Sequence, residues 1–288
     1  MPPADDPLAA LASIRESARA ADGLDPLDEA TTLRLRHRGL TAGDRLLLAP
    51  DEGGFGLLID DEVHLVVAPD HRRRGVGTDL LNRLLDSPPA PRGVLQAWSH
   101  GDHPAARRLA ARAGFVAARE LWVMRRDMAQ PVPRLPAHDG LTITSFHPRE
   151  REALLRVNAA AFASHPEQGA MDAVDLAQRM AEPWYDPAGL LLVHDPAGRL
   201  LGFHWTKRHD ADTGEVYVVG VAPEAQGRGL GRLLTLAGLH HLAVRGVREV
   251  LLYVEADNAA AVGLYSALGF THAAADTHVR YRRGAGPA

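Results

Sequence analysis

Residues 214–234 read GEVYVVGVAPEAQGRGLGRLL, and this stretch decides the fold. β-Branched and aromatic residues dominate 215–221, which predicts a strand. Leucines at helical spacing then predict a helix over 229–245. The glycines between them let the backbone approach a ligand, and the N–H groups of a helix start attract anions. Arg228 and Arg232 add positive charge, so we expect a phosphate site, although the spacing fits neither a dinucleotide fingerprint nor a P-loop.

The same pattern occurs a second time, in HLVVAPDHRRRGVG over residues 64–77. Five positions match at an offset of 154 residues, among them Val67 with Val221 and Gly75 with Gly229. Repeats this long indicate a duplicated domain, because solenoid repeats have periods of about 20–50 residues. The chain is therefore predicted to hold two copies of one fold.

A second motif, EADNAAAVGLYSALGF, spans residues 255–270. Asp257 or Asn258 can cap a helix here, and Gly269 suits a left-handed helix end. Together the two motifs resemble the Q/R-x-x-G-x-G/A loop and the N-x-x-A-x-x-x-Y-x-x-x-G-F helix of the GCN5-related N-acetyltransferases, the GNAT family. The resemblance implies an α/β (α+β) fold with two tandem GNAT domains. Each would be a mixed, mostly antiparallel twisted sheet flanked by helices, with acetyl-CoA as co-substrate.

The chain divides in three in this interpretation. Residues 1–128 form an N-terminal GNAT domain, 129–140 a Pro-rich linker, and 141–288 the catalytic GNAT domain. Within the last part we expect a loop over 165–169 and a final strand over 278–281.

Composition limits the other classes of function. The 288 residues are 46% hydrophobic and 24% charged, which is typical of about two globular domains. The net charge of −4 implies no nucleic-acid binding, and the absence of Cys excludes disulfides, thiolate nucleophiles and Cys-ligated metals. No apolar run approaches the ~20 residues of a membrane span, and no secretion signal is visible. We expect a cytoplasmic monomer without metal.

Glu215 and Tyr265 are the candidate acid–base pair. Glu215 begins the strand that leads into the loop, and Tyr265 lies where the family places a tyrosine near the thioester sulfur. A carboxylate of ordinary pKa is about 4.6 kcal/mol short of deprotonating an α-ammonium and about 8 kcal/mol short for a lysine, so an α-amine is the easier acceptor. A solvent-facing carboxylate and a core tyrosine are the alternatives. Either direct or water-mediated transfer fits the base.

The N-terminal copy lacks this pair. Asp61 stands at the position of Glu215, and Ala110 at that of Tyr265. His103 replaces Asn258. We therefore expect a non-catalytic copy that still binds CoA through its Arg-rich loop, unless that arginine run is only a solvated helix start.

Longer strings over 154–169, 201–207, 214–221 and 251–255 resemble one branch of the family, the mycothiol synthases. This resemblance implies acetylation of the cysteinyl α-amine of a pseudo-disaccharide, cysteinyl-glucosaminyl-inositol, with Glu215 as base and Tyr265 as acid. It assigns the active acetyl-CoA to Val219, Gly220, Val221, Gln226, Gly227, Arg228, Gly229, Leu230, Gly231, Arg232 and Asn258. It assigns a second acetyl-CoA to Leu65, Val66, Val67, Arg73, Arg74, Gly75, Val76, Gly77 and Thr78. It assigns the pseudo-disaccharide to Glu167, Lys207, Glu215, Tyr253 and, across the domain interface, Glu29.

Two other functions stay open at this stage. A tandem acetyltransferase could act on an aminoglycoside, a peptide N-terminus or a polyamine. A CoA sensor without turnover is the second alternative, although the presence of both Glu215 and Tyr265 in one copy argues against it. Lys207, the only lysine, is there either for its point charge or by chance.

Overall fold

The computed structural model describes residues 6–86, 93–138, 140–163 and 166–284. The chain forms two compact units. Unit 1 combines residues 1–122, 255–257 and 274–288, and unit 2 combines residues 123–254 and 258–273. The end of the chain is thus counted with the N-terminal copy. The division into domains at 1–128 and 141–288, with a linker over 129–140, stays a prediction.

Unit 1 contains a sheet with the strand order β1-β2-β3-β4-β11. Its strands are β1 (Arg45–Leu48), β2 (Gly54–Ile59), β3 (Glu62–Val67), β4 (Leu95–Ser99) and the end of β11 (Thr271–Arg283), with the start of β5 (Val116–Asp127) also in the unit. Neighbours are antiparallel except β3 and β4, which are parallel. The final strand expected over 278–281 is longer than predicted: it runs from Thr271 to Arg283, and its residues 279–283 pair with β4.

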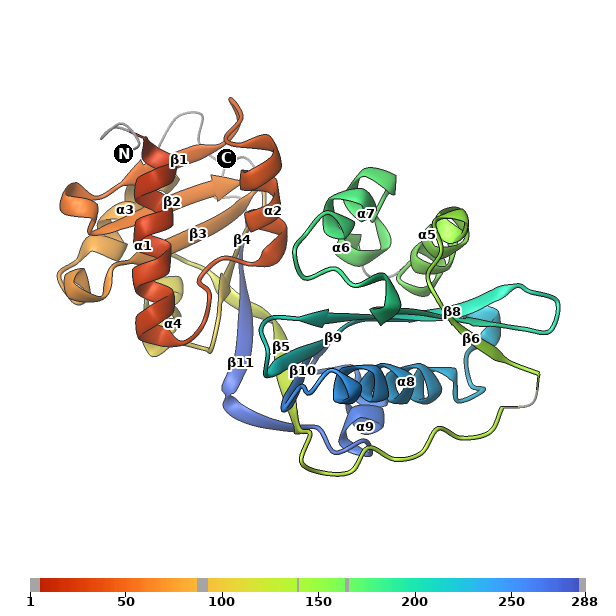
Figure 1. Cartoon of the computed structure of the whole chain (residues 1–288). Coiled ribbons are helices and arrows are strands. Elements are labelled where there is room, and N and C mark those ends of the chain that lie inside the picture. Colours follow the sequence, from red (N-terminus) through yellow and green to blue (C-terminus); the bar gives the residue numbers. More distant parts are fainter. Residues whose placement is uncertain (1–5, 87–92, 139, 164–165, 285–288) are drawn as a thin grey trace. The chain divides into compact units, whose positions relative to one another are not determined.

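Helices cover both faces of this sheet (Figure 1). They are α1 (Pro7–Asp22) and α2 (Glu29–Arg38) on one face, and α3 (Val76–Asp86) and α4 (Pro104–Arg112) on the other. Side chains alternate along a strand, so Leu57 packs into the core under α1 while its neighbour Leu58 packs into the core under α3.

Unit 2 contains the strand order β10-β9-β8-β7-β6, with the end of β5 beside β10. Its strands are β6 (Thr142–Ser145), β7 (Leu190–His194), β8 (Leu200–Arg208), β9 (Thr213–Val221) and β10 (Glu249–Glu255). The pairs from β6 to β9 are antiparallel, and β9 and β10 are parallel. The pairing of β8 with β9 shifts between Trp205 and Thr206, which marks a β-bulge at Tyr217.

Two helices of unit 2 sandwich its sheet. The helix α8 (Leu230–Val244) packs on β8 and β9 from one side, and α5 (Arg151–Ala161) packs on the same strands from the other (Figure 1). The unit also has α6 (Pro166–Gly169), α7 (Ala173–Met180) and α9 (Ala259–Ser266). The loop expected over 165–169 is therefore wrong in part, since four of its residues form a one-turn helix.

Short 3-10 turns connect several elements, at Pro50–Glu52, Pro69–His71, Pro148–Glu150, Pro187–Gly189 and Pro223–Ala225. Each begins with a proline, whose fixed φ suits the first position of such a turn. Two of them, at Pro69 and Pro223, occupy equivalent positions in the repeat, directly after β3 and β9. Among the residues that the structure describes, no helix combines the length and apolar character that a membrane span requires.

Candidate active site

The loop between β9 and α8 has the backbone of an anion site. Gly227 and Gly229 both adopt a φ of 75°, a left-handed conformation that favours glycine. The helix α8 begins after Gly229 without a side-chain cap, and its first hydrogen bond runs from Leu233 N to Gly229 O over 3.0 Å. The N–H groups of the first turn therefore have no partner inside the helix, and they can bind an anion.

The repeated loop in unit 1 has the same backbone. Gly75 has a φ of 87°, and Asp79 N donates to Gly75 O over 3.0 Å at the start of α3. Arg73, which matches Gly227, also adopts a positive φ of 64°. The side chain of Arg72 bonds the carbonyl of Val67, as that of Gln226 bonds the carbonyl of Val221. These contacts confirm that the sequence repeat folds into two loops of one kind.

The parallel strands that lead into both loops separate early. In unit 2 the paired positions of β9 and β10 end at Val216 and Leu252, although β9 runs on to Val221. In unit 1 the pairing of β3 with β4 is limited to Glu62 and Gln96. Beyond these points the backbone edge of β9, and that of β3, is not used by the neighbouring parallel strand. Such an edge can bind an extended ligand by main-chain hydrogen bonds.

Glu215 lies in β9 and is buried, with 5% of its surface exposed. Its Oε2 is 2.7 Å from Nε2 of His209, in the turn between β8 and β9. Lys207 is its cross-strand partner on β8. The alternative of a solvent-facing carboxylate is therefore wrong, because the strand interior and the histidine enclose this side chain.

Lys207 lies against an aromatic cluster. Its Nζ is 4.9 Å from the ring centroid of Trp184 and 5.2 Å from that of Tyr217. Trp205, fully buried, contacts both rings at centroid distances of 5.7 and 5.6 Å. Arg179 of α7 donates from Nε to the Tyr217 hydroxyl over 3.1 Å. Cation–π contacts of this kind hold an ammonium in place.

Tyr265 lies in the last turn of α9 and is half-buried. Its ring packs edge-to-face on Phe270, with 5.8 Å between centroids. Burial raises the pKa of Tyr265 to about 12, so the phenol is protonated throughout the neutral range. The packing on Phe270 agrees with a core aromatic, but it leaves the acid role untested.

The other predicted residues of unit 2 lie at the ends of elements or on the surface. Asn258 caps α9 by accepting from Ala261 N over 3.1 Å, and it is exposed. Tyr253 lies on β10 with 44% of its surface exposed. Glu167 belongs to α6, but its side chain is outside the described residues. Glu29 begins α2 of unit 1.

Unit 1 has different groups at the catalytic positions. Asp61, which matches Glu215, is exposed in a tight turn between β2 and β3, with a φ of 65°. His103 caps α4 through Nδ1, as Asn258 caps α9. Ala110, which matches Tyr265, is buried. Unit 1 therefore keeps the helix start of the motif and lacks a buried carboxylate and a phenol at the matching positions.

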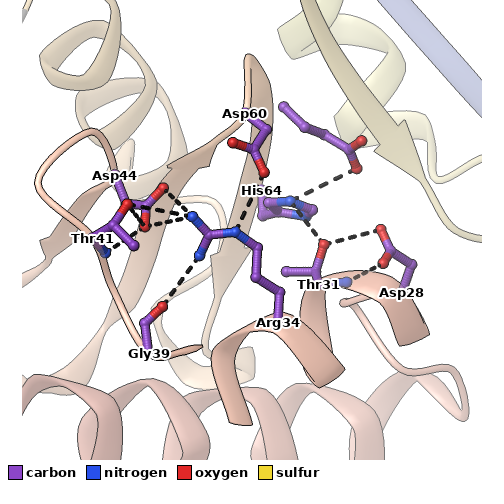
Figure 2. Close-up of polar contacts among 9 residues, drawn as sticks. Asp28, Thr31, Arg34, Gly39, Thr41, Asp44, Asp60 and His64 are labelled. Carbon is purple, nitrogen blue, oxygen red and sulfur yellow. Dashed lines mark hydrogen bonds and ion pairs between the residues drawn. The ribbon is translucent and has the colours of Figure 1, made fainter. Parts of the chain in front are cut away.

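A polar network fills unit 1 beside this turn (Figure 2). Arg34 bonds Asp44 at 2.9 Å and pairs with Asp60 at 3.3 Å, which anchors the turn. Thr31 donates its hydroxyl to Asp28, so Nε2 of buried His64 is the donor in its 3.3 Å contact with Thr31.

Two residues of this network, together with Glu62, could also hold a cation. Asp28, Glu62 and His64 each bring one ligand atom within 4.8 Å of the others. Burial lowers the pKa of His64 to about 4, which keeps the ring neutral near pH 7. The hydrogen-bond chain from His64 through Thr31 to Asp28 satisfies the imidazole Nε2 without a metal ion, and the expected absence of metal stays a prediction.

Sequence reasoning missed His209 and the rings of Trp184, Trp205 and Tyr217. Trp205 and Tyr217 lie within sequence strings that indicate the family, but no pattern in those strings marks their rings as part of a site. The bulge at Tyr217 and the β8–β9 turn bring these groups together. The hairpin pattern with Glu215 on its second strand was the available signal for His209. A histidine in that turn can reach a carboxylate two residues inside the strand.

Known acetyltransferases are similar to this chain in sequence. The sequence profile of the Acetyltransferase (GNAT) family matches residues 31–115 and 154–270. The chain is 56% identical to the mycothiol acetyltransferase of Nocardioides sp., covering 97% of this chain and 99% of that protein. It is 49% identical to the mycothiol acetyltransferase of Thermobispora bispora, covering 95% of each.

Solved structures show the same fold. A GCN5-related N-acetyltransferase from Sphaerobacter thermophilus has a TM-score of 0.70 at 25% identity, covering 98% of this chain and 95% of that chain. A tandem GNAT protein from the clavulanic acid biosynthesis pathway has a TM-score of 0.69 at 21% identity, covering 99% and 97%. The predicted tandem GNAT fold is confirmed, and the chain is an N-acetyltransferase. It belongs to the mycothiol acetyltransferase family within the GNAT superfamily.

Proposed function

We propose that this enzyme transfers the acetyl group of acetyl-CoA to the cysteinyl α-amine of cysteinyl-glucosaminyl-inositol, which completes mycothiol. The observation that carries the chemistry is the buried carboxylate of Glu215 on the strand that leads into the anion loop. The substrate is supported by the names of the relatives, which are mycothiol acetyltransferases at 49–56% identity.

Glu215 acts as the general base. The amine nitrogen must lose a proton to attack the thioester carbonyl carbon, and the carboxylate accepts it directly or through one water. A carboxylate of ordinary pKa leaves about 4.6 kcal/mol to cover against an α-ammonium, which is within reach of an enzyme. Burial next to Lys207 and His209 places this base where the amine can be excluded from bulk solvent.

Unit 2 binds the active acetyl-CoA along β9 and the start of α8. The pyrophosphate occupies the loop from Gln226 to Arg232, where the first-turn N–H groups of α8 are available. The pantetheine arm follows the free edge of β9 near Val219 and Val221. An N–H of this edge can stabilise the oxyanion that forms when the amine adds to the carbonyl.

Tyr265 stabilises the departing sulfur. When the C–S bond breaks, the electron pair goes to sulfur as a thiolate, whose ordinary pKa is near 8.5. Because burial raises the pKa of Tyr265 to about 12, full proton transfer to the thiolate is uphill by roughly 5 kcal/mol. The phenol therefore serves as a hydrogen-bond donor, and the thiolate is protonated later from solvent.

Lys207, Tyr253, Glu167 and Glu29 are proposed to bind the pseudo-disaccharide. A polyol needs polar partners with fixed positions. The Lys207 ammonium is such a partner, because the rings of Trp184 and Tyr217 hold it in place.

Unit 1 is proposed to hold a second acetyl-CoA without turnover. Its support is a loop with the backbone of the catalytic one, with exposed Arg73 and Arg74 beside it.

The test is an assay of CoA thiol release by the full chain with four acceptors. They are cysteinyl-glucosaminyl-inositol, an aminoglycoside, a peptide with a free N-terminus and a polyamine. We expect the first to give the highest kcat/KM by at least tenfold. A higher kcat/KM with another amine would make that amine the substrate instead. No thiol release with any of the four amines would favour a CoA sensor without turnover.

A further inference from the structure

The fold of unit 2 holds His209 against Glu215. His209 Nε2 lies 2.7 Å from Glu215 Oε2, and the side chains are 34% and 6% exposed. The turn that carries His209 is fixed by Asp210, whose Oδ1 accepts from Asp212 N at 2.8 Å and Thr213 N at 2.7 Å. His209 N also donates to Thr213 O over 3.0 Å.

The direction of this hydrogen bond follows from the chemistry of the groups. An ionised carboxylate can only accept, so Nε2 of His209 must carry the hydrogen. Oε2 of Glu215 then accepts a hydrogen bond from the ring, which leaves Oε1 the more basic oxygen for a proton from the amine. A hydrogen bond to the charged form of a carboxylate also favours that form.

We propose that His209 is a positioning residue for the proposed base: it holds Glu215 ionised and turned so that Oε1 faces the amine. This inference rests on the proposed function of Glu215. Charged groups on the elements packed around the pair include Lys207 and Arg208 of β8, and Asp210 and Asp212 of the turn. They also include Glu249 and Glu255 of β10, and Arg179 of α7, which bonds Tyr217. The partner of Glu215 on β10 is Leu251, which is apolar.

Kinetics of the full-length enzyme test the proposal with His209→Ala and His209→Gln. Hydrogen bonds to charged groups correspond to about 10- to 100-fold in rate, so kcat of His209→Ala should fall by that factor at neutral pH. The acid limb of its pH–rate profile should move to higher pH, because the carboxylate then protonates more readily. His209→Gln keeps an N–H donor and should restore most of kcat, and KM for acetyl-CoA should not change.

A second His–Glu pair in unit 2 provides the matched control. His194 Nε2 lies 2.9 Å from Glu150 Oε1, and neither residue belongs to the proposed site. His194→Ala removes a comparable contact and should leave both kcat and the acid limb unchanged. An acid limb that stays in place in His209→Ala, or moves equally in His194→Ala, would overturn the positioning role.

Two further measurements separate this inference from the proposed function. Turnover by Glu215→Gln equal to that of the unchanged enzyme would remove Glu215 as base, and with it the proposed chemistry. The tautomer of His209, read by ¹⁵N NMR of the full chain, does not depend on activity. Protonation at Nε2, with an Nε2 chemical shift that changes in Glu215→Ala, supports the inference, whereas a neutral ring protonated only at Nδ1 contradicts it.

Discussion

Arg72 and Gln226, 154 residues apart, make the same hydrogen bond. Arg72 Nε donates to Val67 O over 3.1 Å, and Gln226 Nε2 donates to Val221 O over 3.3 Å. Each side chain returns to the carbonyl five residues before it, at the end of a strand. Arg72 also pairs with Asp22 at 2.7 Å, so its charge is directed away from the loop. The shared contact sets the loop backbone, whereas the neighbouring side chains set its chemistry.

Arg73→Gly should stabilise unit 1. Arg73 adopts a φ of 64°, where Gly227 stands in the other loop. The left-handed conformation costs an L-residue about 1–2 kcal/mol, and glycine removes this strain. Glycine also increases the entropy of the unfolded chain, which lowers the free energy of unfolding by about 0.4–1 kcal/mol. We expect a net gain of about 0.5–1 kcal/mol in urea unfolding. Arg74→Gly is the control, because Arg74 has no positive φ, and equal stability of the two variants would refute the strain.

Arg73→Ala with Arg74→Ala should remove one acetyl-CoA from the chain. Charge-assisted contacts to a phosphate are worth about 1.5–3 kcal/mol each, so the unit 1 site should weaken at least roughly tenfold. Native mass spectrometry should count two acetyl-CoA molecules in the unchanged chain and one in the variant, with turnover kept. The control variant, Arg36→Ala with Arg38→Ala, removes the same charge from α2 and should still bind two acetyl-CoA molecules. Complete loss of activity would contradict the division of roles.

Tyr265→Phe should lower kcat roughly 10- to 100-fold, because the thiolate loses a hydrogen bond worth about 1.5–3 kcal/mol. KM for acetyl-CoA should stay the same, since the ring keeps its packing on Phe270. Burial raises the pKa of Tyr265 to about 12, so the phenol loses its proton only above that pH. If the pH–rate profile falls at a lower alkaline pH, another group causes that fall, and it should also be seen in Tyr265→Phe. An unchanged kcat would remove Tyr265 from the mechanism, and Tyr281→Phe in unit 1 is the control.

Trp184→Leu should raise KM for the acceptor amine and leave KM for acetyl-CoA unchanged. The Lys207 ammonium lies 4.9 Å from the Trp184 ring centroid, a contact worth about 0.5–2 kcal/mol, or roughly 2- to 30-fold. Trp98→Leu is a matched control, because Trp98 of unit 1 lies 5.6 Å from Arg280 in a similar contact. Equal KM values in the two variants would show that Lys207 does not depend on this ring.

Acid should destabilise unit 2 through His204. Burial lowers the pKa of His204 to about 4, from an ordinary value near 6.5, and its Nδ1 lies 2.7 Å from Leu234 O. The native state favours the neutral ring, so its contribution is complete above pH ~6.5 and is lost as the pH falls toward about 4. The total loss is about 3 kcal/mol below that pH.

Unfolding free energies measured across this pH range check the contribution of His204. His204→Gln should be less stable at neutral pH but should lose less stability on acidification than the unchanged chain. His240→Gln, in which a partly exposed histidine is changed, should retain the full slope. The same slope in His204→Gln would show that this ring titrates normally.

Local patterns predicted much of the fold. The strand into Val221, the helix after Gly229 and the second copy of both at an offset of 154 all appear in the structure. Motif spacing predicted the GNAT family, because glycine positions are set by local backbone conformation. The full length of β11 was not predictable, because strand pairing with segments distant in sequence, such as that of residues 279–283 with β4, leaves no local pattern.

By itself the sequence determined the family, the duplication and the position of a carboxylate on the strand that enters the loop. Those properties depend on neighbours along the chain, which a linear pattern records. Only the tertiary structure decided that this carboxylate is buried against His209, that Lys207 faces two aromatic rings, and that Asp61 is exposed in a turn. Burial and side-chain contacts arise when separate segments pack together, and packing sets the environment of each group.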